Sequence, residues 1–286
     1  LKQFEMAQDF PDTKYDCMRY FIGDVRDKER LNRAFRNVDY VIHAAAIKQV
    51  PAAEYNPFEA VKTNILGAQN IINVAIDHGV KKVIALSTDK AANPVNLYGA
   101  TKLCSDKLFI AGNSYVGQDH SIFGVVRYGN VAGSRGSVIP FFLKCRKTGV
   151  LPITDPRMTR FWITLEQGVN FVLSRLETMV GGELFVPKLP SMNIMDLAKV
   201  IAPECKTEVI GIRPGEKLHE VMITKDDARN TLEFKDHYMI QPDFHYWKRR
   251  YNARDGHSVP EDFEYSSGNN PWKLDSNSMR GIIDNL

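Results

Sequence analysis

The stretch that most constrains how this chain can fold is ALSTDKAANPVNLYGATK, residues 85–102. It begins within an apolar run, residues 83–86, that predicts a buried strand, and after a proline-containing loop it becomes a predicted helix near Tyr98. Tyr98 and Lys102 are four residues apart, so they lie on one face of that helix. Polar residues directly after a buried strand lie where an open α/β sheet binds its ligands. The stretch therefore predicts a strand, a loop and a helix with a binding site at the end of the strand.

A tyrosine and a lysine at this spacing can move a proton. The pKa of a tyrosine hydroxyl is about 10, too high for a base at neutral pH. The Lys102 ammonium, together with a bound cationic nicotinamide ring, would favour the tyrosinate and lower the pKa of Tyr98. Tyr98 could then take a proton from a substrate hydroxyl while a hydride leaves the same carbon. The alternative is a solvated helix face, because the pattern alone occurs by chance; the preceding strand favours the catalytic interpretation.

Seven segments carry a resemblance to a known family. They are, in chain order, LKQFEM (1–6), FIGDVRD (21–27), HAAAIKQVPAAEYNP (43–57), STDKAANPVNLYGATK (87–102), RYGNVAGSRGSVIPFF (127–142), MTRFWIT (158–164) and IGIRPGEKLHE (210–220). Together they resemble the extended short-chain dehydrogenase/reductase family, and within it the inverting branch of the sugar-nucleotide 4,6-dehydratases. The similarity covers nearly the whole chain and keeps the order of the family's motifs, so it is far more specific than the tyrosine–lysine pair.

The resemblance implies a fold class. We expect an α/β protein with a doubly wound, Rossmann-like parallel sheet and a smaller C-terminal substrate domain. Residues 1–136 would form the NADP-binding domain. Residues 137–286 would form the substrate-binding region and a C-terminal appendage, with the chain exchanging between the two parts.

The apolar patterns predict individual elements. Strands are expected at residues 18–23, 40–44, 82–87, 121–128, 183–187 and 209–212, and helices at residues 28–37, 57–78, 98–111, 164–177 and 193–202. From residue 225 onward the sequence is aromatic and polar with poor periodicity. We expect this last part to pack on the substrate domain or to form an oligomer interface.

One feature of the implied fold is missing from the sequence. The chain opens at LKQFEMAQDF, without a start methionine and without the Gly-x-x-Gly-x-x-Gly turn of a dinucleotide-binding domain. The expected strand, turn, helix and second strand would take roughly 40 residues. We therefore expect a fragment cut just after the second strand. The alternative is a protein that never had the loop and has a non-functional cofactor site.

Charge and cysteine content exclude several classes of function. With 37 basic and 34 acidic residues the net charge is +3, which gives no global argument for nucleic acid or membrane binding, and the short basic run at residues 248–250 is more typical of a solvated face. The sequence has no apolar run of about 18 residues, no signal peptide and no zinc-protease motif. Four widely spaced cysteines suit free thiols in the cytoplasm. We expect a cytoplasmic homo-oligomer without a metal.

The resemblance also implies the reaction. Tyr98 would deprotonate the C4 hydroxyl of UDP-N-acetylglucosamine as NADP⁺ accepts the hydride, while Lys102 keeps Tyr98 ionised and binds the nicotinamide ribose. The C4 ketone acidifies the C5 proton, so one group must remove that proton and another must protonate the leaving C6 hydroxyl. Lys90 is predicted to be the base and Asp89 the acid, with Thr88 in the same catalytic set. The alternative for Asp89 and Lys90 is a turn with two solvated charges.

The hydride would then return to C6. The implied product is a 4-keto-6-deoxy sugar with inverted configuration at C5, UDP-2-acetamido-2,6-dideoxy-β-L-arabino-hexos-4-ulose. Because the cofactor is regenerated, the net change is that of a hydro-lyase. The reaction would open the biosynthesis of pseudaminic acid or a related sugar used on polysaccharide or flagellin.

Two further sets of residues are assigned by the resemblance. The expected cofactor contacts are Lys2, Asp24, Val25, Ala44, Ala45, Ala46, Lys48, Leu86, Ser87, Tyr98 and Lys102. The expected substrate contacts are Lys48, Asn130, Val131, Ala132, Gly133, Ser134, Arg135, Val138, Thr154 and Arg213.

Some of these assignments have local alternatives. Asp24 and Val25 would meet the adenine, but an aspartate could equally cap the following helix. Lys2 would suit a 2′-phosphate, which favours NADP over NAD. Asn64 would brace the site through backbone contacts, or it could be a buried asparagine with ordinary partners. Lys48 could be a surface charge.

Three other functions remain open. A retaining 4,6-dehydratase would differ only at C5, and Asp89-Lys90 argues against it because the retaining enzymes carry an Asp-Glu pair there. A 4-epimerase would need no acid/base pair after Thr88. A non-catalytic sensor of nucleotide sugars would keep the pocket without turnover.

Overall fold

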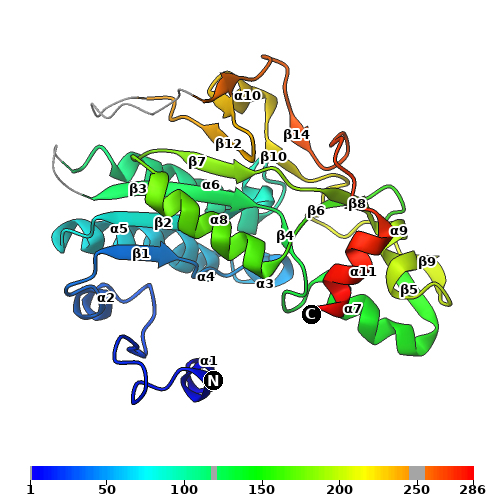
Figure 1. Cartoon of the computed structure of the whole chain (residues 1–286), viewed down its shortest axis with the longest axis horizontal. Helices are drawn as coiled ribbons and strands as arrows, with labels where there is room; N and C mark the ends of the chain where they lie inside the picture. Colours follow the sequence, from blue (N-terminus) through cyan, green and yellow to red (C-terminus); the bar gives the residue numbers. More distant parts are fainter. Residues whose placement is uncertain (1, 117–120, 245–254) are drawn as a thin grey trace.

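A seven-stranded sheet, counted over the part of the chain that the structure describes, forms the centre of the molecule (Figure 1). The structure, a computed structural model, describes residues 2–116, 121–244 and 255–286. The strands, in spatial order, are β1 (Tyr40–His43), β2 (Lys82–Thr88), β3 (Ile122–Tyr128), β7 (Leu184–Pro187), β12 (His237–Ile240), β11 (Thr231–Glu233) and β13 (His257–Ser258). The first four run parallel to one another, and each of the last three is antiparallel to the strand before it in this order. The predicted α/β class is confirmed.

Helices cover both faces of the parallel part of the sheet, as a doubly wound fold requires. Helices α5 (Gly67–Asp77) and α6 (Leu97–Gly112) lie behind the sheet in Figure 1, and α8 (Leu165–Thr178) lies in front of it. Consecutive residues of one strand pack on opposite faces of the sheet, because side chains alternate along a strand. Val83 packs in the core with Phe109 of α6, whereas Ile84 packs with Val172 of α8.

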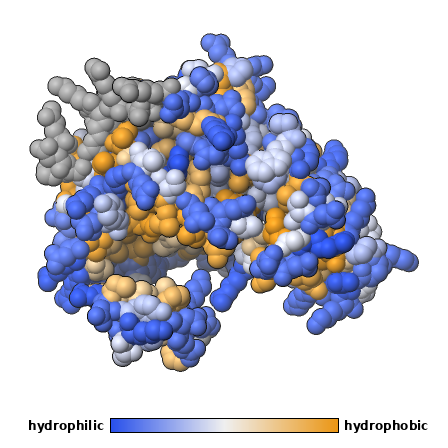
Figure 2. Space-filling model, in the orientation of Figure 1, coloured by the Kyte–Doolittle hydropathy of each residue, from blue (hydrophilic) through white to orange (hydrophobic). Residues whose placement is uncertain are grey.

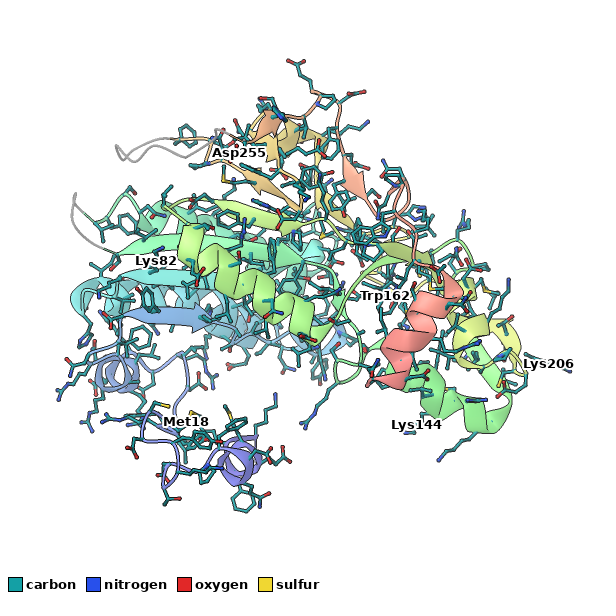
Figure 3. The ribbon with its side chains drawn as sticks, viewed as in Figure 1. Met18, Lys82, Lys144, Trp162, Lys206 and Asp255 are labelled. Atoms are coloured by element: carbon teal, nitrogen blue, oxygen red, sulfur yellow. The ribbon has the colours of Figure 1, made fainter. Side chains whose placement is uncertain are left out.

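The end of α8 is tied to β2 by one lysine. Lys82, labelled in Figure 3, donates hydrogen bonds to the carbonyls of Leu176 and Glu177 at 2.9 and 2.6 Å. The last carbonyls of a helix have no partner within the helix, so a lysine there satisfies them and complements the helix dipole.

The remaining elements of this part of the chain precede β1 or lie between β1, β2 and β3 in sequence. They are α1 (Lys2–Asp9), α2 (Lys28–Ala34), α3 (Val50–Tyr55), α4 (Pro57–Val61), the π-turn η1 (Lys62–Leu66) and the 3₁₀ turn η2 (Asp89–Ala91). The helix predicted at residues 57–78 is the continuous run of α4, η1 and α5.

A second group of elements packs beside the carboxyl ends of β2 and β3. β10 (Val221–Ile223), α10 (Lys225–Ala228) and β14 (Tyr265–Ser266) contribute to the central core. The second group holds β4 (Asn130–Val131), α7 (Val138–Cys145), η3 (Arg146–Thr148), β5 (Val150–Ile153), β6 (Thr159–Ile163), β8 (Ser191–Asn193), α9 (Ile194–Ile201), β9 (Lys206–Val209) and α11 (Ser276–Asp284). Its own core contains the buried Trp162, which lies in β6 between the two groups in Figure 3. Asn193 caps α9, as predicted.

Two predicted strands and the end of one predicted helix differ from the structure, and the prediction for the C-terminal segment holds only in part. Residues 18–23 form no strand, and the strand predicted at 209–212 instead ends at Val209. The segment after residue 225 adds β12, β11 and β13 to the central sheet, which was not predicted, whereas its last helix α11 packs on α9 in the second group, in line with the predicted packing on the substrate domain. The helix predicted at residues 28–37 ends earlier, at Ala34. The basic run at residues 248–250 lies outside the described residues.

Figure 2 shows hydrophobic surface in the middle of this view, over α8 and the edge of the sheet at β1. The large apolar side chains exposed on these elements are Tyr40, Ile42, Leu165, Val169 and Leu173. Among the described helices, none is both long and apolar enough to span a membrane.

Candidate active site

The carboxyl end of β2 brings three of the predicted catalytic residues together. The Thr88 hydroxyl donates to Asp89 Oδ1 at 3.0 Å, and Lys90 Nζ lies 3.0 Å from the same oxygen. Asp89 is 1% exposed, whereas the Lys90 side chain is 28% exposed. A buried carboxylate is costly unless it is paired, so this ion pair compensates for the burial of Asp89.

Helix α6 adds Tyr98 to this group. The side chain of Asn96 caps the helix by accepting from the Gly99 N–H at 2.8 Å, which places Tyr98 in the first turn. Burial raises the pKa of Tyr98 to about 12, although the Lys90 ammonium and a hydrogen bond with Thr88 act to lower it. In the protein alone, Lys90 is thus a cation that acts to lower the pKa of Tyr98, and the role predicted for Lys102 beside a bound nicotinamide stays a prediction.

Lys102 lies one helical turn further on, above a buried polar layer. Burial lowers the pKa of Lys102, and the nearby Asp106 opposes that shift. Asp106 Oδ2 accepts from Ser87 Oγ at 2.7 Å and from Arg127 Nη2 at 3.4 Å. Burial raises the pKa of Asp106, against the effect of Arg127. The Ser87 hydroxyl predicted to face the cofactor is therefore bound to Asp106.

One residue of the cluster was missed by sequence reasoning. Glu220 is 2% exposed, and its Oε1 lies 3.3 Å from Lys90 Nζ and 3.6 Å from Arg160 Nε. Burial acts to lower the pKa of Lys90, but the carboxylates of Asp89 and Glu220 outweigh it and raise that pKa. The sequence gives two signals for Glu220: it ends the resembling segment IGIRPGEKLHE, and it is an acidic residue directly before the short apolar run of β10.

Asn64 braces the loop that follows β1. Its Oδ1 accepts from the Ile47 N–H at 2.8 Å, and its Nδ2 donates to the Ile47 carbonyl at 3.0 Å and to Thr101 Oγ1 at 2.9 Å. Asn64 lies in the π-turn η1, a distortion that often marks functional sites. These contacts agree with the backbone bracing that the resemblance implied.

The predicted cofactor residues fall into two groups. Ala44, Ala45, Ala46 and Lys48 are exposed directly after β1, and Leu86 is half-buried on the neighbouring β2. The parallel strands β1 and β2 therefore present this group at one edge of the sheet, beside the catalytic cluster.

The other group lies on the segment before α2. Lys2 is exposed on α1, which Figure 1 shows apart from the sheet. Asp24 neither ends a strand nor caps α2: its carboxylate binds Arg26 at 2.7 Å, and Asp27 is the cap. Val25 packs against the central core.

The predicted substrate residues line a loop after β3. Asn130 and Val131 form β4, Ala132 is buried, and Gly133 has a φ of +71° that favours glycine. The loop continues with Ser134, the exposed Arg135 and, at the start of α7, Val138.

Two predicted substrate residues lie elsewhere and have partners within the protein. The Thr154 hydroxyl donates to Met158 Sδ at 3.0 Å. The exposed Arg213 has its Nε 3.6 Å from Glu216 Oε1. Across the described residues, no group of three or more metal-ligating side chains is gathered.

Comparison with known proteins shows the family to which this chain belongs. The sequence model of the family described as "Polysaccharide biosynthesis protein" matches residues 1–242. The chain belongs to this polysaccharide biosynthesis protein family. It is 59% identical over 292 residues to the UDP-N-acetylglucosamine 4,6-dehydratase (inverting) of Campylobacter jejuni subsp. jejuni, covering 99% of this chain and 86% of that protein.

Solved structures agree with this membership of the polysaccharide biosynthesis protein family. The X-ray structure of Pen from Bacillus thuringiensis matches with a TM-score of 0.89 and 37% identity, covering 99% of this chain and 86% of that one. A double mutant of DesIV, a dTDP-glucose 4,6-dehydratase from Streptomyces venezuelae, with NAD and DAU bound, shares the fold with a TM-score of 0.63 and 24% identity, over 70% of this chain and 69% of that one. The resemblance to the extended short-chain dehydrogenase/reductase family is confirmed.

Proposed function

We propose that this chain is a UDP-N-acetylglucosamine 4,6-dehydratase that inverts C5. The observation that carries the proposal is the 59% identity to a relative of that name over 99% of the chain. The cluster of Thr88, Asp89, Lys90 and Tyr98 supports it, because it holds a candidate proton acceptor for C4 beside an acid and a base for elimination.

A nicotinamide cofactor, when bound, supplies the acceptor for the C4 hydride and returns that hydride to C6. The exposed Ala44, Ala45 and Ala46 fit such a group, because their small side chains let the backbone approach it closely. Tyr98 and Lys102 would hold its reactive end. We propose NADP rather than NAD, because Lys2 would suit a 2′-phosphate.

Tyr98 is the proposed acceptor of the C4 hydroxyl proton. Its phenol is protonated in the protein alone, because burial raises its pKa to about 12. The Lys90 ammonium and the Thr88 hydroxyl favour the tyrosinate. Lys102, buried within the same helix face, adds a cation close to any group bound against Tyr98.

Asp89 and Lys90 are the proposed pair for elimination. As an ion pair they hold the proton on the wrong partner, because the base must be a neutral amine and the acid a carboxylic acid. Transfer of one proton from Lys90 Nζ to Asp89 Oδ1, across 3.0 Å, produces both forms at once. Lys90 would then take the C5 proton, and Asp89 would give its proton to the C6 hydroxyl as it leaves as water.

A proton NMR time course in D₂O tests the proposal with UDP-N-acetylglucosamine and NADP⁺. A 4-keto-6-deoxy product with deuterium at C5 and the L-arabino configuration is expected. The D-xylo configuration would mean a retaining enzyme. An unchanged spectrum despite substrate binding would favour a non-catalytic sensor.

Other expectations from the sequence stay predictions. They are the domain boundary after residue 136, a homo-oligomeric assembly, a cytoplasmic location and a place at the start of pseudaminic acid or related sugar biosynthesis.

A further inference from the structure

A strap at residues 213–220 crosses from the second group of elements to the catalytic helix. Asn96 Nδ2, at the start of α6, donates to the Gly215 carbonyl at 2.8 Å. On the other side, Arg160 in β6 donates to the carbonyls of Lys217 and Leu218, both at 3.1 Å. The strap is therefore fixed on both sides, and Glu220 is its last residue.

The backbone of Glu220 is held as firmly as the strap. Its N–H donates to Ser267 Oγ at 2.9 Å, and its carbonyl accepts from the Ser267 N–H at 2.8 Å. These two bonds fix the direction in which the side chain leaves the backbone. As a result the buried Glu220 carboxylate lies at the end of β2, although Glu220 is far from Lys90 in sequence.

The side chain of Glu220 contacts two cations. Oε1 lies 3.3 Å from Lys90 Nζ and 3.6 Å from Arg160 Nε, while Oε2 is buried without a hydrogen-bond partner among the described residues. A buried carboxylate with one unsatisfied oxygen costs stability that an apolar side chain would not. Such a costly group at the active site is typical of a functional rather than a structural role.

Lys90 needs a second anchor. Its ammonium ends a flexible four-carbon chain whose donors rotate freely. Asp89, the preceding residue, fixes the nitrogen from one side only, at 3.0 Å. Glu220 approaches from a different element, so the nitrogen is held between two carboxylates, and Arg160 compensates part of the added negative charge.

We propose that Glu220 is a positioning residue that aims Lys90 at the C5 proton during elimination. The inference rests on the proposed function and concerns one step of it. The C4 oxidation depends on Tyr98 and Lys102, which Glu220 does not contact in the described structure, and on the charge of Lys90, which acts on Tyr98 through space and so tolerates a small shift of the ammonium group. Loss of Glu220 should therefore slow elimination and leave C4 oxidation in place.

Glu220→Gln tests this division of steps. It keeps the size of the side chain and removes its charge, so the charged contact that anchors Lys90 is weakened to a contact with a neutral amide. We expect turnover to fall on the order of 10²-fold, as for a catalytic group misplaced by about 1 Å, with little change in KM. On mixing with UDP-N-acetylglucosamine, the near-ultraviolet absorbance of reduced nicotinamide should accumulate, because oxidation outruns elimination.

Two further variants keep the test decisive. Glu183→Gln is the matched control, because Glu183 is also 2% exposed but binds the backbone N–H groups of Val180 and Gly181 away from the site. It should lose stability without accumulating reduced cofactor. Glu220→Asp keeps the charge and shortens the reach, so it should show a smaller loss with the same accumulation, even if the Gln variant folds poorly.

The outcomes separate the two proposals. Product from the parent together with accumulation in the Glu220 variants supports both. Parent-like turnover in Glu220→Gln, or a loss of turnover without accumulation in both Glu220 variants, overturns the positioning role while the dehydratase function stands. A parent that binds substrate and makes no product overturns the function itself.

Discussion

The glycine after the catalytic tyrosine leaves no room for a side chain. A Cβ on Gly99 would lie 2.2 Å from the Lys90 carbonyl oxygen, about 1 Å closer than an ordinary contact of 3.4 Å, and 3.1 Å from Pro94 Cβ. The nearest obstacle is backbone, so no side-chain rotation can relieve it. Gly99→Ala must therefore push α6 away from η2 and separate Tyr98 from Lys90.

The expected stability change combines two opposing effects. Alanine is favoured over glycine within a helix by about 0.5–1 kcal/mol, but an overpacked site costs about 1–3 kcal/mol or more. We expect Gly99→Ala to lose about 1–2 kcal/mol, a fall in Tm of several degrees. Because the displacement of about 1 Å lies between reacting groups, turnover should fall on the order of 10²-fold.

Gly281→Ala is the matched control for this change. Gly281 lies within α11, and nothing stands within 4 Å of its added Cβ. This variant should gain about 0.5–1 kcal/mol and keep parent turnover. Thermal unfolding and the NMR assay measure both quantities. If Gly99→Ala unfolds no earlier than the parent and turns over at the parent rate, the steric argument is refuted.

Two further predictions concern buried polar side chains near the site. Burial, with a contribution from Lys102, lowers the pKa of His43 to about 4, so below about pH 6.5 the unfolded chain binds a proton that the folded chain does not. The free energy of unfolding should therefore fall by about 3 kcal/mol as the pH drops toward 4. Measured by urea unfolding at a series of pH values, the slope of this free energy against pH should be flatter in His43→Phe than in the parent. An equal slope in both proteins would contradict this. Asn64→Ala leaves the backbone groups of Ile47 without their partner and should cost about 3 kcal/mol in urea unfolding, whereas the exposed control Asn277→Ala should change stability by less than about 0.5 kcal/mol. A loss as small as the control's would show that the loop after β1 needs no brace.

The unit from β2 to α6 could be predicted because its signals are local. An apolar run, a proline-containing loop and the spacing of Tyr98 and Lys102 all lie within a short stretch. Glu220 could not be found this way, because its place beside Lys90 depends on tertiary bonds from Asn96 and Ser267.

The wrong strand at residues 18–23 has a different cause. Strand formation needs a neighbour, and within the described residues no strand pairs with this segment; the Ile22 carbonyl accepts instead from Arg30 Nε at 2.6 Å. The strands β11, β12 and β13 were missed for the opposite reason. They are too short to show an alternating pattern, yet β7 provides an edge on which β12 pairs, and β11 and β13 are added in turn.

The path of the chain limits how the molecule can move around a substrate. The chain leaves the central sheet after β3, returns through α8 to β7, leaves again at β8, and returns through β10 to β11 and β12. Two bodies close about a hinge most easily when few chain segments cross between them. Every crossing segment must bend in the same motion, so each additional crossing makes closure harder. Rigid-body closure is therefore strongly restricted here. Access to the site is expected to be controlled by the loop at residues 132–137 and by individual side chains, on the faster timescale of loop motion.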